Sequence, residues 1–145
     1  MTAPAGCPLC EGPGGRLLVQ GARWRLVHAD EPGFPAFYRV VWQEHVREFS
    51  ALAPADRAEC LEVVVAVEQA LLRHLRPAKV NLASLGNAVP HLHWHVIARF
   101  DWDSHFPGAV WAQPLRTADR ERIAGLSALL PSLEADLVSR LQPPA

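Results

Sequence analysis

The residues most able to do chemistry are three histidines at every second position, His91, His93 and His95. In a β-strand, side chains at i, i+2 and i+4 share one face at intervals of about 6.6 Å, so the pattern predicts a row of imidazoles. A neutral imidazole is nucleophilic near neutral pH, while a neighbouring ring can act as an acid or orient it. The row therefore fits attack on phosphorus, with the middle residue, His93, as the nucleophile.

Two simpler interpretations compete with this one. A single histidine in a strand is usually structural or exposed to solvent, and a pair at i and i+2 often serves only as metal ligands. Three in strict alternation favour a functional site, because clustered titratable residues are associated with function. A purely structural or metal-only set of histidines remains the alternative.

The elements that must position these histidines are predicted from residue patterns. Strands are expected over 23–28, 37–42, 79–84 and 91–100, and a long helix is expected over 54–75, with Pro54 in its first turn and Pro77 beyond its end. Leu92, Trp94 and Val96 alternate with the histidines and should pack against this helix. Thr117 is expected to cap a last helix that ends at about residue 141. The order of elements predicts an α+β fold: an antiparallel sheet with a long helix packed on one face and an additional C-terminal helix.

Length, composition and charge limit what the chain can be. With 145 residues, half of them apolar, the chain is expected to form a single domain over 1–145. A net charge of −1 with scattered cations argues against binding long nucleic acid or a membrane surface. No apolar run is long enough to span a bilayer, and the first residues do not resemble a secretion signal. The odd number of cysteines, three, fits a reducing compartment, so we expect a cytoplasmic protein.

The stretch NLASLGNAVPHLHWHVI, residues 81–97, resembles the histidine triad (HIT) family, whose signature is His-φ-His-φ-His-φ-φ with φ hydrophobic. The similarity extends over a core of about 7–111, and the C-terminal helix at about 117–141 lies outside it. The resemblance implies a HIT-like fold and a hydrolase or nucleotidyl transferase that attacks the α-phosphate of a nucleoside phosphate derivative. Dinucleoside polyphosphates and nucleoside phosphoramidates are the implied substrates. It further implies a covalent nucleotidyl-histidine, no cofactor required for catalysis, and a homodimer.

The resemblance also implies roles for particular residues. His93 would attack phosphorus, His95 would contact phosphate and help protonate the leaving group, and His91 would support His93. Asn87 lies where the family places a polar side chain against phosphate, and the Gly86-Asn87 turn can present N–H groups to an anion. Further substrate-binding candidates are Asp30, for the ribose hydroxyls, and Asn81 on the neighbouring strand. Asn87 and Asp30 are also common turn residues, which is the alternative explanation for both.

Two positions depart from the family pattern. Many relatives carry a fourth active-site histidine in the second predicted strand, where this chain has Phe37. The proline that often follows the φ-φ pair is Ala98 here. The missing histidine bears on the pKa of His93 and on the shape of the pocket wall, and so on the choice of substrate.

Cys7 and Cys10 have the spacing with which two thiolates bind one tetrahedral zinc, and His45 and His91 are the candidates to complete the set. His45 matches a position from which some relatives supply a zinc ligand together with the first histidine of the triad. Such a zinc would be structural and would not meet substrate. A redox pair or two idle thiols are the alternatives, but the turn residues after Cys10 argue against a redox helix.

Three functional hypotheses follow. The leading one is an enzyme of the histidine triad type whose partner is a small nucleotide. The second is a catalytically inactive nucleotide-binding or regulatory module with a structural zinc, which the absent fourth histidine favours. The third is a metalloprotein whose function is the zinc itself.

Overall fold

The computed structural model describes residues 3–144, which form a five-stranded antiparallel sheet with helices, as expected for an α+β fold. Along the chain the elements are α1 (Pro8–Glu11), β1 (Arg16–Gln20), β2 (Trp24–His28), β3 (Phe37–Trp42), the 3-10 turn η1 (Phe49–Ala51), α2 (Pro54–Leu75), β4 (Lys79–Ala83), β5 (His93–Arg99), α3 (Arg120–Ser127) and α4 (Leu130–Leu141). The strand order is β1-β2-β3-β5-β4, so β5 lies between the central strand β3 and the edge strand β4.

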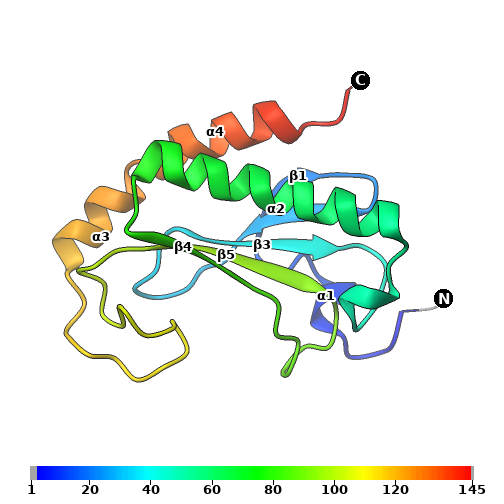
Figure 1. Ribbon diagram of the computed structural model, residues 1–145, viewed down its shortest axis with the longest axis horizontal. Helices are drawn as coiled ribbons and strands as arrows, with labels where there is room; N and C mark the ends of the chain where they lie inside the picture. Colours follow the sequence, from blue (N-terminus) through cyan, green and yellow to red (C-terminus); the bar gives the residue numbers. More distant parts are fainter. Residues whose placement is uncertain (1–2, 145) are drawn as a thin grey trace.

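The two longest helices cover one face of the sheet. In Figure 1, α2 and α4 lie side by side on this face, and α1 lies on the other side. The prediction of a long helix over 54–75 is confirmed at both ends, since Pro54 opens α2 and the chain leaves it at Arg76 in a left-handed conformation. The opposite face of β3 and β5 is therefore left available for a site.

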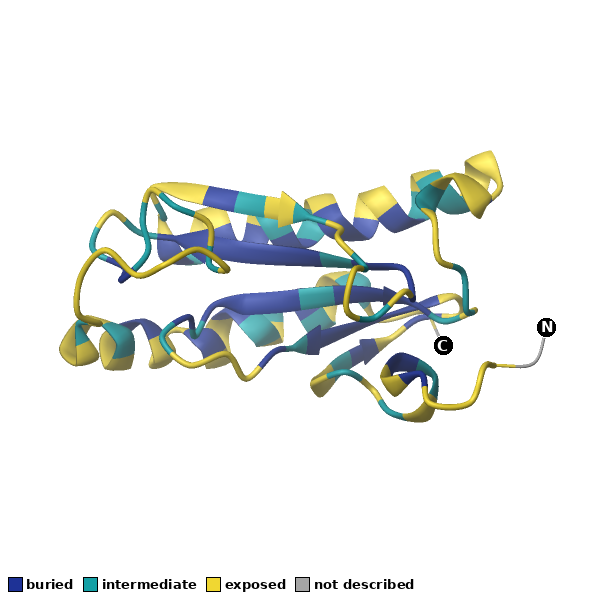
Figure 2. Ribbon diagram, turned by 90° about the horizontal axis from the view of Figure 1, so that it is seen from below, coloured by how far each residue is buried: buried dark blue, intermediate teal, exposed yellow. Residues whose placement is uncertain are grey.

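The main core lies between α2 and the sheet. Leu92 and Val96 are buried in it beside the α2 residues Val64 and Leu71, and Trp94 packs against the same cluster. This confirms the predicted alternation, in which the residues between the histidines face the helix. Figure 2 shows that the central strands are buried along their length, whereas the outer strand β4 carries exposed residues. The strand that carries the histidines is thus among the most rigidly held.

Two strands differ from the sequence-based expectation. β1 was not predicted, because it is a short edge strand with mostly exposed residues and has little of the alternation that marks a strand. β5 begins at His93 rather than residue 91. The chain before it turns, with the N–H of His91 donating to the carbonyl of Val89 and the N–H of Leu92 donating to the carbonyl of Val46. His91 therefore lies outside the strand.

The expected C-terminal helix over 117–141 is two helices, α3 and α4. Asp119 rather than Thr117 caps the first, because the Asp119 carboxylate accepts the backbone N–H of Arg122. α4 is joined to the sheet by Glu134, whose carboxylate accepts the Tyr38 hydroxyl at 3.0 Å and pairs with Arg16 at 2.8 Å. The added helices thus extend the cover over the helical face of the sheet.

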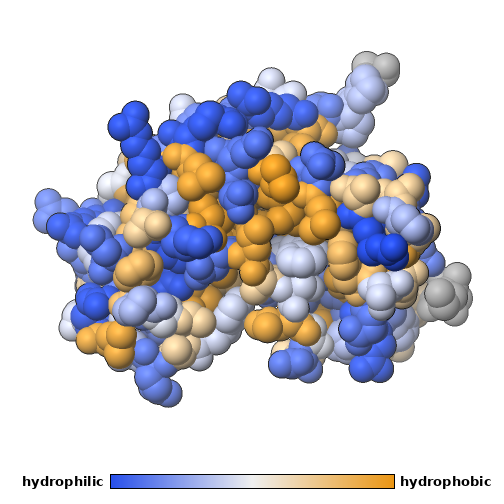
Figure 3. All heavy atoms as spheres, viewed as in Figure 1, coloured by the Kyte–Doolittle hydropathy of each residue, from blue (hydrophilic) through white to orange (hydrophobic). Residues whose placement is uncertain are grey.

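Apolar side chains remain exposed on one side of the molecule. Figure 3 shows apolar atoms gathered over α2, where Leu61, Val65 and Leu72 are each more than a third exposed, and Leu82 on β4 is 42% exposed. Among the described residues, no helix is both long and apolar enough to cross a membrane.

Candidate active site

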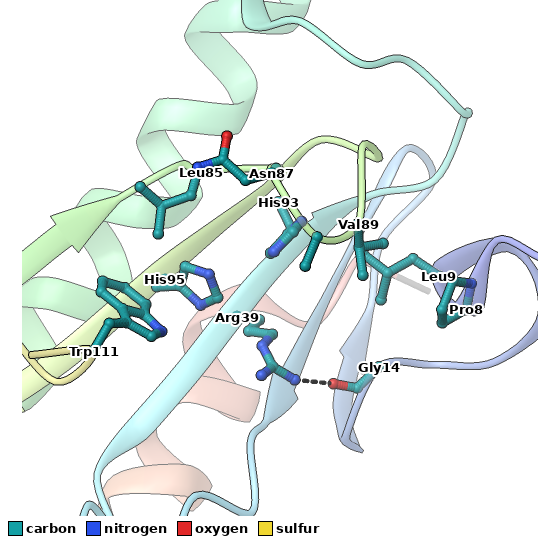
Figure 4. A pocket seen from close by; sticks show the side chains of 12 residues that line it. Pro8, Leu9, Gly14, Arg39, Leu85, Asn87, Val89, His93, His95 and Trp111 are labelled. Atoms are coloured by element: carbon teal, nitrogen blue, oxygen red, sulfur yellow. Dashed lines mark hydrogen bonds between the residues drawn. The ribbon is translucent and has the colours of Figure 1, made fainter.

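His93 and His95 are placed on the open face of the sheet by the register of β3 and β5. In this antiparallel pairing Val41 lies opposite His93 and Arg39 lies opposite His95. Directly opposed side chains share a face, so Arg39 is brought beside the two histidines although it lies more than fifty residues earlier in the chain. Figure 4 shows all three side chains entering the same hollow.

One backbone hydrogen bond fixes the orientation of His93. Its Nδ1–H donates to the carbonyl of His91 at 2.6 Å. The neutral ring therefore keeps its proton on Nδ1 and leaves the lone pair of Nε2 free. A free Nε2 lone pair in a pocket is the requirement for a histidine nucleophile.

His95 has the complementary arrangement. Its Nδ1 is buried and has no hydrogen-bond partner, so a proton on that atom would lack an acceptor. The tautomer with its proton on Nε2 avoids a buried, unpaired N–H and would donate into the pocket. The rings of His93 and His95 meet edge to face, with centroids 4.8 Å apart. The pocket thus holds an electron-pair donor and a hydrogen-bond donor side by side.

Burial governs the titration of the three histidines. Burial lowers the pKa of His95 to about 4, with smaller contributions from His93 and the cation Arg39. Burial also lowers the pKa of His93 and of His91, while the carbonyls that accept their N–H groups oppose that shift. All three rings are consequently neutral at neutral pH, which suits a nucleophile.

The pKa of His95 predicts how stability depends on pH. Below its usual value of 6.5 the unfolded chain binds a proton at His95 that the folded protein does not bind. The free energy of unfolding therefore has its full value above about pH 6.5, and part of it is lost as the pH falls toward 4. His95→Asn should remove about 2 kcal/mol of the difference in unfolding free energy between about pH 7.5 and pH 5. Urea denaturation across this range tests it, with His105→Asn as control, and parallel curves for His95→Asn and the unchanged protein would contradict it.

A pocket of about 440 Å³ surrounds His93 and His95. The residues that line this triad pocket come from the N-terminal segment, β3, the segment before β5, β5 itself and the segment after it: Pro8, Leu9, Gly14, Arg39, Leu85, Gly86, Asn87, Ala88, Val89, His93, His95 and Trp111. Its volume falls in the range of small-ligand sites, and its lining is mostly apolar with a few polar groups.

Arg39 was not among the sequence-predicted site residues. Its guanidinium donates to the carbonyl of Gly14 at 2.8 Å and lies over the ring of Phe37. Burial lowers its pKa, but an arginine stays protonated, so the pocket contains a positive charge. An arginine inside the otherwise apolar run FYRVVW was the available signal, and only the strand register reveals its importance.

The two predicted turn residues, Gly86 and Asn87, do line the triad pocket. Gly86 has φ +72°, a left-handed conformation that glycine adopts without strain. The Asn87 side chain is exposed at the rim, and its amide points away from the rings of His93 and His95 (Figure 4).

The structure does not bring Asp30 and Asn81 into the pocket. Asp30 is exposed in the β2–β3 loop and borders a different hollow, formed by that loop with α3 and the start of α4. Asn81 lies opposite Ile97, which is further along β5 than His95, and its side-chain oxygen accepts from Arg99 at 2.9 Å. That hydrogen bond gives Asn81 a structural role in this arrangement.

Aromatic rings surround His95 on the side away from His93. Phe37, at the position where the resemblance to the family predicts a fourth histidine, meets the His95 ring edge-on, with ring centroids 5.4 Å apart. The indole of Trp111 meets it at 5.2 Å, and Phe37 also contacts Trp111. Phe37 therefore replaces a polar neighbour by an apolar one, in keeping with the lowered pKa of His95.

The ring of His91 faces away from the triad pocket, toward Cys7, Cys10 and His45. Its Nε2–H donates to the carbonyl of Trp42 at 2.6 Å, which leaves the Nδ1 lone pair directed at this cluster. The expectation of three rings in one row is thus wrong for His91, because the turn before β5 rotates it out. His91 supports His93 through its backbone carbonyl instead.

The geometry of this cluster fits a tetrahedral metal. The Nδ1 atoms of His91 and His45 are 3.2 Å apart, and His91 Nδ1 lies 3.4 Å from the sulfur of Cys7 and of Cys10. Tetrahedral zinc with its usual bond lengths requires about 3.3 Å between two nitrogens and about 3.6 Å between nitrogen and sulfur. The four ligand atoms all lie within 4.8 Å of one another, so the set could hold one ion.

Arg25 holds the cysteine segment in place. This buried side chain donates to the carbonyls of Leu9 and Pro13 and to the side-chain oxygen of Gln43. These bonds fasten the turn that carries both cysteines to β2 and to the segment leading to His45. The cluster is thus positioned by the protein itself.

Comparisons with known proteins place the chain in a family. The sequence model of the HIT domain matches residues 16–102, which is more than half of the chain. The protein therefore belongs to the HIT domain family, as the histidine pattern indicated.

Solved structures agree with this assignment. A histidine triad protein from Marinobacter aquaeolei has 27% sequence identity and a TM-score of 0.67, over 86% of this chain and 92% of the other. One from Bradyrhizobium japonicum has 25% identity and a TM-score of 0.66, over 83% and 90%. A zinc-bound histidine triad family protein from Mycobacterium smegmatis shares the fold, with 21% identity and a TM-score of 0.59, over 92% and 94%. No curated protein sequence matches the chain.

Proposed function

We propose that this single-domain protein is a nucleotide hydrolase or nucleotidyl transferase that attacks the α-phosphate of a nucleoside phosphate derivative through a covalent nucleotidyl-His93. The observation that carries the proposal is the pair of adjacent histidine rings in the pocket: His93, whose Nδ1–H is bonded to the carbonyl of His91, beside His95, whose Nδ1 is buried without a partner. Membership of the HIT domain family supports the class of reaction.

The geometry supports a two-step mechanism. The Nε2 lone pair of His93 forms a bond to phosphorus as the bond from phosphorus to the leaving oxygen or nitrogen breaks. His95 Nε2–H donates a hydrogen bond to the leaving atom and stabilises the electron pair that it takes away. In the second step water, or an acceptor in a transferase, forms the new bond to phosphorus and His93 is released. Across both steps the leaving group gains one proton and the attacking nucleophile loses one.

Arg39 would supply the positive charge that the phosphate requires. The carbonyl of Gly14 occupies one of its N–H groups, so other N–H groups can bind phosphate oxygens, and charge-assisted hydrogen bonds of this kind are strong. The backbone of the Gly86-Asn87 turn would add N–H donors at the rim. Arg39 thus places a cation on β3, two residues after Phe37, where the resemblance predicts a fourth histidine.

Replacing Arg39 should weaken substrate use without unfolding the protein. Arg39→Gln is expected to lower kcat/KM about 10- to 100-fold, the value of one hydrogen bond to a charged group, and Arg39→Lys should lose less. The control is Arg120→Gln, which removes the same charge at an exposed position of α3 outside the triad pocket. Steady-state kinetics decide the matter, and equal losses for the two glutamine variants would count against a role for Arg39.

The covalent intermediate provides the direct test of the proposed function. Protein quenched in alkali during turnover of diadenosine triphosphate or an adenosine phosphoramidate should carry an acid-labile nucleotidyl group on His93, detectable by mass spectrometry. Turnover with the nucleotide attached to another residue, or with no adduct under single-turnover conditions, would refute the mechanism.

We further propose that Cys7, Cys10, His45 and His91 bind a structural zinc that meets no substrate. The ligand distances support it, and a fold relative from Mycobacterium smegmatis is described as zinc-bound. The alternative of a catalytically inactive module would keep this zinc and bind nucleotide without turnover.

We also propose that the protein is a cytoplasmic homodimer. The exposed apolar side chains of α2 and β4 provide a surface for the contact between the two copies.

A further inference from the structure

The triad pocket has two apolar ends, one on each side of the histidines. In Figure 4, Leu9 and Val89 lie on the far side of His93, whereas Trp111 and Leu85 lie on the side of His95. Trp111 and Leu85 are each 52% exposed, unusually high values for large apolar residues at the wall of a pocket. The His95 end therefore presents apolar surface that no part of the described chain covers.

The order of groups in the pocket assigns this end to the leaving group. This step rests on the proposed function, in which His93 attacks phosphorus and His95 donates to the leaving atom. A donor must lie within hydrogen-bond reach of the atom that it serves. A group attached to that atom and extending past His95 meets Trp111 as the next ring, with the two ring centroids 5.2 Å apart.

Trp111 is held firmly enough to shape a ligand site. Phe37 on β3 packs against the Trp111 ring edge to face, with the two ring centroids 6.5 Å apart. The segment that carries it is fastened by Arg99, which is 1% exposed, forms two hydrogen bonds with the Asp103 carboxylate and donates to the carbonyl of Gly108 at 2.7 Å. An exposed indole on a fastened segment loses little conformational freedom when a ligand stacks on it.

We propose that Trp111 and Leu85 form a leaving-group subsite that accepts a flat aromatic ring. A planar ring can stack on the indole while Leu85 covers its other side, and the polar end of the leaving group stays beside His95 and Arg39. The ring can be borne by an amine attached directly to the α-phosphorus, or by a further phosphate, as in the second nucleoside of a dinucleoside polyphosphate. The subsite selects for the ring in both cases.

The expected selectivity follows from the energy of stacking. Aromatic stacking on a protein ring is worth enough to give a preference of about tenfold or more over a non-planar ring of similar size. A puckered cyclohexyl group buries comparable apolar area but cannot stack, so it isolates the contribution of planarity.

Matched substrates test the subsite. The first pair is the 2-phenylethylamide and the 2-cyclohexylethylamide of AMP, and the second pair is the corresponding P2 esters of ADP. The ratio of kcat/KM for phenyl over cyclohexyl is measured within each variant, so that any general loss of activity cancels. We expect a ratio of about ten or more in at least one pair, and the pair that shows it identifies how the ring is attached.

Variants of Trp111 connect the ratio to this residue. Trp111→Phe should keep the preference, whereas Trp111→Leu and Trp111→Ala should bring the ratio close to one. Leu115→Ala, an exposed apolar position on the same segment outside the pocket, should leave the ratio unchanged. A ratio near one in the unchanged protein, or a preference that survives Trp111→Ala, overturns the subsite and leaves the proposed function standing. Failure to cleave any of the four compounds, together with diadenosine triphosphate, overturns both.

Discussion

His93→Ala is expected to lower kcat by at least about 10,000-fold, because removing a covalent nucleophile leaves only binding and hydrogen-bond contributions to catalysis. The variant should remain folded. The His93 ring forms one hydrogen bond, to the backbone carbonyl of His91, and otherwise borders the pocket, so its loss should disturb little of the core. Nucleotide binding should persist, since Arg39 and the Gly86-Asn87 turn do not depend on the His93 ring.

Three measurements make this result interpretable. Turnover is measured with an excess of enzyme, nucleotide binding by calorimetry, and folding by the unfolding midpoint. His74→Ala, which changes a histidine on α2 outside the pocket, is the matched control and should keep full activity. Residual activity within about tenfold of the unchanged protein would exclude His93 as the nucleophile, since ordinary positioning residues cost more than that.

The second large effect is expected from loss of the metal. Cys10→Ser should release the zinc and lower the unfolding midpoint by about 10 °C, because a metal that binds only the folded chain stabilises it by several kcal/mol. Here the hydrophobic core is formed by α2 and the sheet independently of the cluster. The variant should therefore still fold, unlike a small zinc finger.

Metal analysis and thermal unfolding test this prediction together. The unchanged protein should contain about one zinc per chain, and a strong chelator should reproduce the effect of Cys10→Ser. Cys60→Ala is the matched control, because Cys60 lies on α2 away from the cluster and should keep the metal. Zinc bound equally well by Cys10→Ser, or an unchanged midpoint after chelation, would contradict a structural zinc.

The metal cluster and the pocket are connected through one residue. The ring of His91 faces the cysteines, while its carbonyl accepts the Nδ1–H of His93. A metal on the ring would therefore restrain the carbonyl that orients the nucleophile. The zinc would support catalysis through position alone, in keeping with a metal that does not touch substrate.

Much of the fold was predictable from local patterns. The helical spacing between Pro54 and Pro77 predicts α2, because apolar residues at threes and fours must share one face to be buried. The alternation of apolar residues with histidines predicts the strand and which of its faces meets the helix. β1 was missed because an edge strand buries little. The last helix was predicted as one although Pro131, in the first turn of α4, marks the start of a second helix just after the break at Ala128 and Leu129.

The chemistry of the individual site residues was also visible in the sequence, but their grouping was not. By itself the sequence determined that alternate histidines would meet an open face and that two cysteines could share a metal. Only the tertiary structure decided that His91 turns to those cysteines and that Arg39 lies opposite His95. It also decided that Trp111 closes the far end and that Asp30 lies elsewhere. The physical reason is strand register. A shift of two residues between β3 and β5 would keep Arg39 on the open face but move it away from His95, and the alternation of apolar residues, which has a period of two, does not distinguish these registers.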